Sequence, residues 1–114
     1  MVANSLQSGR VVSLGSINMD LVALCKNLPY PGQTVHGTSL EMIPGGKGAN
    51  QAVAAVRAGA ETVMIGAAGK DDAFGQQLAD FLFNENIDIS HVSSVEGVTG
   101  TALIAVEESG KILL

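Results

Sequence analysis

The stretch PGGKGANQAVAAVRAG, residues 44–59, decides the fold. Its first half is rich in glycine. Its second half has apolar residues at helical spacing, with Gly59 placed to end a helix. The apolar positions are Ala49, Ala52, Val53, Val56 and, just beyond the stretch, Ala60. We therefore expect a glycine-rich turn at residues 45–48 that leads directly into an amphipathic helix.

The turn at residues 45–48 has two interpretations. Glycines let a ligand approach the backbone, and the unpaired N–H groups of a helix's first turn suit a polar ligand. The same glycines can also serve only to shape a tight turn. The pattern is not the G-x-x-x-x-G-K-[ST] phosphate loop, because Lys47 is followed by Gly48. It is not a dinucleotide fingerprint either. The spacing thus leaves a structural turn and a ligand cradle equally open.

The segments around this helix predict the rest of an α/β unit. RVVSL (10–14) and ETVMIGA (61–67) are apolar runs typical of buried strands in a parallel sheet. A second helix should follow Asp71 and Asp72, whose charges suit a helix start, and Asn86 can cap its end in the left-handed conformation. The apolar face of this helix would comprise Phe74, Leu78, Phe81 and Leu82. The alternation of strand and helix indicates parallel strands with right-handed crossovers.

Other extended segments do not fit this alternation. They are residues 21–25, residues 34–43 and the pair TGTALIAV (99–106) and KILL (111–114), which a turn at ESG separates. The two prolines of LPYPG (28–32) mark a turn. We expect these segments to form a sheet appended to the main one. Because the chain stops inside the last strand, with no helix after it, we expect a fragment of a longer fold.

Composition narrows the classes of function. The 114 residues are 46% hydrophobic and 15% charged, with 14 glycines and a formal net charge of -5. With only six Lys and Arg residues, a nucleic-acid-binding surface is not expected, and a small-molecule partner fits better. The first ten residues lack the pattern of a secretory leader, and no apolar stretch reaches membrane-spanning length. The lone Cys25 is expected to be buried, and the protein to be cytoplasmic.

GSINMD, residues 15–20, follows the first predicted strand, where ligands of α/β sheets gather. If the backbone is extended, Asn18 and Asp20 share one face and Ile17 and Met19 share the other. An amide and a carboxylate side by side can donate to and accept from vicinal hydroxyls, which is sugar-like chemistry. The alternative, which the residues alone favour, is that Asn18 and Asp20 form a turn through local backbone hydrogen bonds.

Taken together, five motifs resemble those of the ribokinase-like carbohydrate kinases. In chain order they are GSINMD, PGQTVHG, GGKGANQAVAAVRAGA, GKDDAFG and TGTALIAV, and they cover the chain from about Val11 to its end. The resemblance implies an α/β ribokinase-like fold: a central, mostly parallel sheet with flanking helices and a small β-sheet lid. Residues 1–114 would be the N-terminal part, with lid strands at about 21–44 and 99–114, and the nucleotide-binding half would be absent.

The resemblance also implies a reaction and a site. The family reaction would be ATP-dependent phosphorylation of D-ribose on its 5-hydroxyl, giving D-ribose 5-phosphate, with Mg²⁺ and a monovalent cation such as K⁺. The implied sugar-binding residues are Asn18, Asp20, Gly46, Lys47, Asn50 and Ala102. The family's general-base aspartate sits in a G-A-G-D motif that this sequence lacks, so no catalytic residue is assigned. Its place would be beyond Leu114, and the chain alone is expected to be inactive.

Several alternatives stay open. Relatives of this kind often pair their lids, so a homodimer through the lid is expected. The rival hypotheses are a non-catalytic sugar-binding or dimerising fragment, and a related kinase with another sugar or a nucleoside as substrate. His36 and His91 are not at metal-ligand spacing with Cys or a carboxylate, so no metal site is assigned to the chain. Met42 and Met64 are expected to fill the core.

Overall fold

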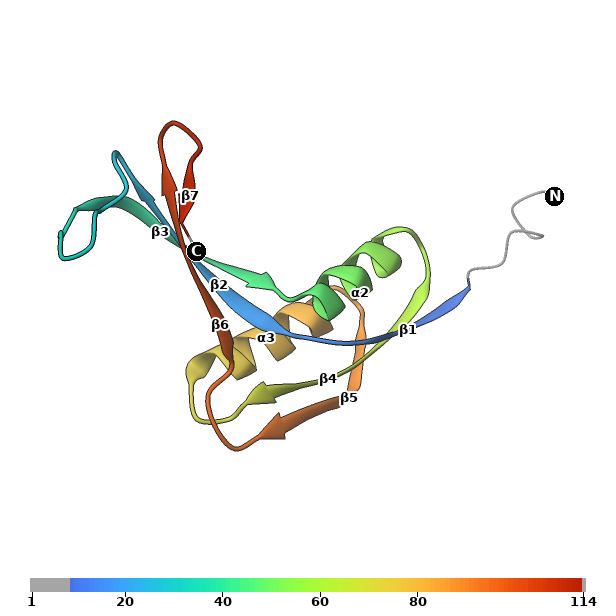
Figure 1. The fold of residues 1–114 in the computed structure, drawn as a ribbon. Coiled ribbons are helices and arrows are strands. Elements are labelled where there is room, and N and C mark those ends of the chain that lie inside the picture. Colours follow the sequence, from blue (N-terminus) through green and yellow to red (C-terminus); the bar gives the residue numbers. More distant parts are fainter. Residues whose placement is uncertain (1–8, 114) are drawn as a thin grey trace.

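The computed structural model describes residues 9–113. These residues form two separate sheets and two helices. Figure 1 shows the two parts: an α/β body, and a second sheet that extends away from it. The expectation that the first ten residues do not form a secretory leader concerns mainly residues 1–8, which lie outside the described residues. Leu114, at the end of the last expected strand, also lies outside them. Neither helix in the described part is long and apolar enough to cross a membrane.

The sheet of the body has three strands in the order β1 (Arg10–Leu14), β4 (Glu61–Gly69) and β5 (Asp88–Val95). Both pairings are parallel, which confirms the prediction from the alternating strands and helices. Gly15 extends the first pairing by donating its N–H to the carbonyl of Ile65 at 3.2 Å. The carboxyl ends of β1 and β4 therefore meet at one edge of the body.

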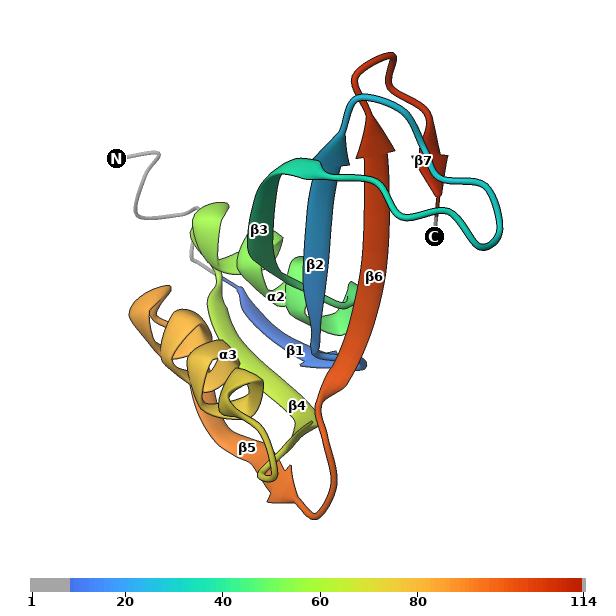
Figure 2. The ribbon, with the colours of Figure 1, turned by 90° about the vertical axis from the view of Figure 1, so that its left-hand side faces the viewer.

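Two helices, α2 (Lys47–Arg57) and α3 (Ala73–Asn84), cover one face of this sheet, as Figures 1 and 2 show. Their ends are as predicted: Gly59 (φ 99°) follows α2, and Asn86 (φ 65°) follows α3 in the left-handed region. Asp72 is the N-cap of α3. The core lies between helices and sheet and consists of Ile17, Met19, Ala49, Ala52, Met64, Leu78, Leu82 and Ile87.

The expected burial of the first strand is wrong. In β1, Val12 is 55% exposed and Leu14 is 76% exposed, whereas Ser13 between them is buried against α2. Val12 and Leu14 point to the face of the sheet that carries no helix in the described residues, and β1 is an edge strand. Because only one face is covered, alternate residues of an otherwise apolar strand remain in contact with water.

The second sheet has the order β3 (Gly37–Gly45), β2 (Asn18–Cys25), β6 (Gly100–Glu107) and β7 (Ile112–Leu113). Strand β2 pairs antiparallel with β3 and parallel with β6, and β6 turns back into β7. This agrees with the expectation of an appended sheet, with two shifts in its bounds: β2 begins three residues earlier than predicted, and β3 is one strand that starts at Gly37.

Burial differs sharply between the two sheets. Strand β3 is exposed from Gly37 to Ile43. Met42, predicted to fill the core, is 55% exposed because it lies on this strand, whereas Met64 in the body is fully buried as predicted. Cys25 is buried, also as predicted, and its thiol donates to the carbonyl of Val106 at 3.6 Å.

Candidate functional site

The candidate site lies where the second sheet joins the body. Ser16, in the β1–β2 connection, holds the start of α2 in place. The N–H of Lys47 donates to Ser16 Oγ at 3.0 Å, and the N–H of Ala49 donates to the Ser16 carbonyl at 3.0 Å. The expectation that these N–H groups are unpaired is therefore wrong for Lys47 and Ala49, because the neighbouring loop satisfies them.

The glycines of the turn allow this close approach. Gly46 has φ 95°, and a Cβ added to it would lie 2.5 Å from the Ser16 carbonyl oxygen. A Cβ on Gly48 would lie 2.6 Å from the carbonyl carbon of Gly15. Gly48 also accepts a hydrogen bond on its carbonyl from Ser13 Oγ at 2.7 Å. The structural interpretation of the glycine-rich turn is thus confirmed, and the turn places Gly46 and Lys47 beside the base of β2.

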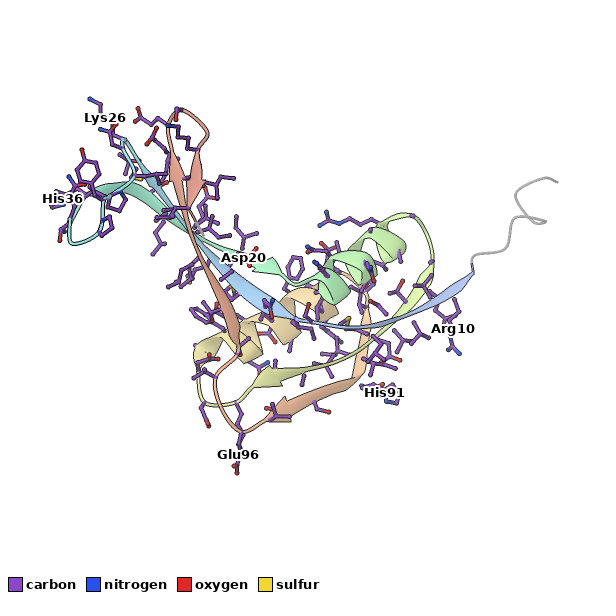
Figure 3. All side chains as sticks on the ribbon, viewed as in Figure 1. Arg10, Asp20, Lys26, His36, His91 and Glu96 are labelled. Carbon is purple, nitrogen blue, oxygen red and sulfur yellow. The ribbon has the colours of Figure 1, made fainter. Side chains whose placement is uncertain are left out.

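Asn18 and Asp20 lie in strand β2, not in a turn, so the turn-forming interpretation is wrong. They share one face of the strand and are half-buried, while Met19 between them faces the core and is 2% exposed. Among residues 9–113, neither side chain has a hydrogen-bond partner within the chain. Figure 3 shows Asp20 close to the point where β3 leads into α2. Its carboxylate is therefore available to a ligand.

Glycines flank both polar side chains. A Cβ on Gly45 of β3 would lie 2.7 Å from Asp20 Oδ2, and a Cβ on Gly100 of β6 would lie 2.5 Å from Asn18 Oδ1. Any other residue at these two positions would press on the carboxylate or the amide. Because glycine has no side chain, the Asp20 carboxylate and the Asn18 amide can lie directly against the neighbouring strands at Gly45 and Gly100.

Ala102 belongs to the same face. It is the register partner of Asp20 in the parallel β2–β6 pair, and it is half-buried. A small apolar residue beside a carboxylate and an amide gives a surface with one apolar and two polar contacts. Such a combination suits a sugar, whose ring presents C–H groups as well as hydroxyls.

Asn50 has a different environment. It lies in the first turn of α2, where its N–H donates to the Gly46 carbonyl at 2.8 Å, and its side chain is exposed. Together with Pro44 and Phe81 it lines a groove of about 200 Å³ between α2 and α3. Lys47 is exposed at the start of the same helix. The structure therefore brings Asn18, Asp20 and Ala102 onto one face, with Gly46 and Lys47 at its base, and Asn50 lines the groove between α2 and α3.

Sequence reasoning missed the role of Asp72 beyond the start of α3. Its carboxylate accepts hydrogen bonds from the N–H of Thr99 (2.9 Å), from the Thr99 hydroxyl (2.9 Å) and from the N–H of Gly75 (3.2 Å). Loss of hydration alone would raise the pKa of Asp72, but these bonds and one from the N–H of Phe74 outweigh it, so the pKa lies below its usual value. In the sequence, this contact is signalled only by the presence of the two motifs GKDD (69–72) and TGT (99–101).

Metal-binding groups do not gather in the described part of the chain. No group of three His, Cys, Asp or Glu side chains there could hold a metal ion. His36 and His91 are both exposed, and Figure 3 shows them on different parts of the molecule.

Comparison with known proteins gives the family. Residues 8–113 match the family described as pfkB family carbohydrate kinase, and the chain belongs to that family. Ribokinase from Lactococcus lactis is 41% identical over 107 residues, which are 92% of this chain and 35% of the relative. Ribokinase from Bacillus subtilis is 43% identical over 83% of this chain and 32% of its own length. The chain thus spans about a third of the length of these relatives.

Solved structures confirm the ribokinase-like fold. Ribokinase from Giardia lamblia superposes with a TM-score of 0.81 at 36% identity, covering 94% of this chain and 32% of that one. The Arabidopsis thaliana ribokinase complexed with ribose and ATP superposes with a TM-score of 0.82 at 29% identity, covering 94% and 35%. The resemblance drawn from the motifs is therefore confirmed for both family and fold.

Proposed function

We propose that this chain is the sugar-recognising part of a ribokinase and that it binds D-ribose on the face of β2 that carries Asn18 and Asp20. The observation that carries the proposal is the pair of unbonded polar side chains flanked by Gly45 and Gly100. A carboxylate that accepts and an amide that both donates and accepts can together bind adjacent hydroxyls. Sequence identity of 41–43% to ribokinases supports ribose over other sugars.

The remaining contacts would come from the turn before α2 and from β6. Gly46 and Lys47 would close one side of the sugar through a backbone group and an ammonium, and Ala102 would contact its apolar face. Among residues 9–113 no hydrogen bond joins the Asn50 side chain to Asn18 or Asp20, and Asn50 lines the groove between α2 and α3. It is accordingly the residue whose assignment depends most on the family resemblance.

In this proposal the complete reaction transfers phosphate from ATP to the 5-hydroxyl of D-ribose. The general-base aspartate and the sites for ATP, Mg²⁺ and K⁺ would belong to the other two thirds of a ribokinase-length protein, so the chain alone would bind sugar without turnover. Phosphoryl transfer depends on positioning and charge stabilisation, which a sugar site cannot supply alone. The second sheet would act as a lid that excludes water. A cytoplasmic location fits the use of ATP.

A homodimer through the lid is part of the same proposal. The face of the second sheet opposite Asp20 bears an apolar groove of about 370 Å³. It is lined by Leu21, Ala23, Leu40, Leu103, Ile104, Ala105 and Leu113. Leu103 is 70% exposed and Leu40 is 67% exposed, so a second copy that packs its own lid here would bury an apolar surface. A fragment that dimerises without chemistry is the alternative that this groove favours.

Calorimetric titration of the chain with D-ribose, D-fructose and adenosine tests the proposal, together with an assay of ATP turnover. We expect 1:1 binding of D-ribose and no turnover. Asp20→Ala should weaken binding by roughly 1.5–3 kcal/mol, because a charged hydrogen-bond partner is lost. Asp80→Ala is the matched control, since Asp80 is an exposed carboxylate on α3 that, within residues 9–113, accepts a hydrogen bond only from Gln76. Equal affinity of the wild type and Asp20→Ala would refute the assigned site, and preference for adenosine would favour a nucleoside kinase.

A further inference from the structure

The second sheet is joined to the body by three connections, which are held by two separate sets of hydrogen bonds. The β1–β2 and β3–α2 connections are bonded to each other through Ser16. The third, residues 96–99 between β5 and β6, is bonded to the loop before α3. In it, the N–H of Gly97 donates to Asp71 Oδ2 at 2.7 Å, and Thr99 makes two bonds to Asp72. The position of β6 therefore depends on this loop.

Within that connection, Thr99 is buried and makes hydrogen bonds through both its N–H and its hydroxyl. It is 3% exposed, and its hydroxyl donates to Asp72 Oδ1 while accepting from the N–H of Gly69 at 3.0 Å. Its N–H donates to the other oxygen, Asp72 Oδ2. Capping of α3 needs only one acceptor, which Oδ1 provides to Gly75. The second carboxylate oxygen is thus used to hold Thr99.

The residue after Thr99 reaches the candidate site directly. Gly100 is the register partner of Asn18, and a Cβ added to Gly100 would lie 2.5 Å from Asn18 Oδ1. The next partners along the same pair are Thr101 with Met19, and then Ala102 with Asp20. A shift of Thr99 would therefore move both the glycine beside Asn18 and the alanine beside Asp20.

We propose that Asp72 is a positioning residue: by holding Thr99, it sets the place of β6 against β2 and so the surroundings of Asn18 and Asp20. Calling these surroundings a ribose site rests on the function proposed above. Asp72 itself would not touch the sugar. It would act through the fixed geometry of Thr99 and Gly100, as outer partners of binding residues do.

The test compares Asp72→Asn with Asp71→Asn in the whole chain. Asparagine caps helices as well as aspartate, but its amide nitrogen cannot accept from the Thr99 N–H. Asp71→Asn is the matched control, because Asp71 accepts from Gly97 in the same connection and makes no hydrogen bond to Thr99 among the described residues. We expect Asp72→Asn to raise the Kd for D-ribose about tenfold, Asp71→Asn to change it less than about twofold, and Thr99→Ser to retain the wild-type value.

A second readout separates this inference from the proposed function. In NMR spectra without sugar, Asp72→Asn should shift the side-chain amide signals of Asn18 and the Gly100 backbone signal, and Asp71→Asn should leave them in place. If the wild type fails to bind ribose, the proposed function fails, and these spectra still decide whether Asp72 positions Asn18. Thr99→Val, which removes only the hydroxyl, serves if Asp72→Asn does not fold. Unmoved signals in a folded variant, or an unchanged Kd beside a ribose-binding wild type, would overturn the inference.

Discussion

The α/β body and the second sheet differ in what covers their strands. In the body, Met64 of β4 and Leu78 and Leu82 of α3 are almost completely buried between the helices and the sheet. In the second sheet, most of β3 and the apolar side chain of Leu103 remain exposed. A fold stabilised by its own core therefore carries a sheet that has little core of its own. The polar pair Asn18 and Asp20 lies at the boundary, where the packed body meets the largely uncovered sheet.

The largest expected effect is in the body. Leu82→Ala should lower the free energy of unfolding by about 2–5 kcal/mol, because a fully buried leucine leaves a cavity. Leu103→Ala is the matched change in the second sheet, and it should cost under about 0.5 kcal/mol because Leu103 is already exposed. Urea unfolding followed by circular dichroism measures both. Similar losses for the two variants would contradict the division into a packed body and an uncovered sheet.

The second expected effect concerns the junction. Alanine usually stabilises a helix relative to glycine, but Gly48→Ala would place a Cβ 2.6 Å from the Gly15 carbonyl carbon. We expect a loss of roughly 1–3 kcal/mol from this overlap, since two backbone segments would have to separate. Gly9→Ala is the control, because nothing lies within 4 Å of its added Cβ. Thermal unfolding compares them, and a gain in stability from Gly48→Ala would refute the close approach of α2 to the β1–β2 connection.

The third prediction is a dependence on pH. Because the pKa of Asp72 is lowered in the folded chain, the stabilisation from its carboxylate is complete above its unfolded pKa, near 4. It is lost as the pH falls through the lower, folded pKa. Thermal midpoints recorded from pH 7 down to pH 3 should therefore fall less steeply for Asp72→Asn than for the wild type. Parallel curves would show that Asp72 does not hold Thr99 through its charge.

The smallest effect on stability is expected from Leu103→Asp. The substitution lies on the exposed apolar face of the second sheet and should leave the unfolding free energy within about 0.5 kcal/mol of the wild type. If two copies pair through this face, the charge should abolish the dimer in sedimentation equilibrium. Glu41→Gln, an exposed change on the opposite face of β3, is the control. A dimer that persists in Leu103→Asp would place the interface elsewhere.

Local signals in the sequence predicted the body well. Helical spacing located α2 and α3, Asn86 was placed correctly as a left-handed cap, and the parallel pairing of the flanking strands followed from their order. Burial was predicted less well. The apolar run of β1 resembles a buried strand and Met42 was expected in the core, but a side chain of an edge or appended strand is buried only if another element covers it. Val12 and Met42 are exposed for that reason.

The site could be predicted only in part. The alternation around Met19 placed Asn18 and Asp20 on one face only if the backbone was extended, and the residues alone favoured a turn instead. The pairing of Asp20 with Ala102 joins strands 82 positions apart, and no periodicity within either segment specifies that register. The same is true of the hydrogen bonds that Ser16 accepts from the start of α2 and of those that Asp72 accepts from Thr99. Such contacts depend on how distant loops meet and become visible only in the folded chain.

The most direct test is a titration of the isotopically labelled chain with D-ribose, followed by NMR. We expect the largest shifts on the backbone signals of Asn18, Asp20 and Ala102. The signals of Leu21 and Leu103, on the opposite face of the second sheet, should stay in place. Shifts confined to Leu21 and Leu103, or to the groove between α2 and α3, would contradict the assignment of the sugar site to the Asp20 face.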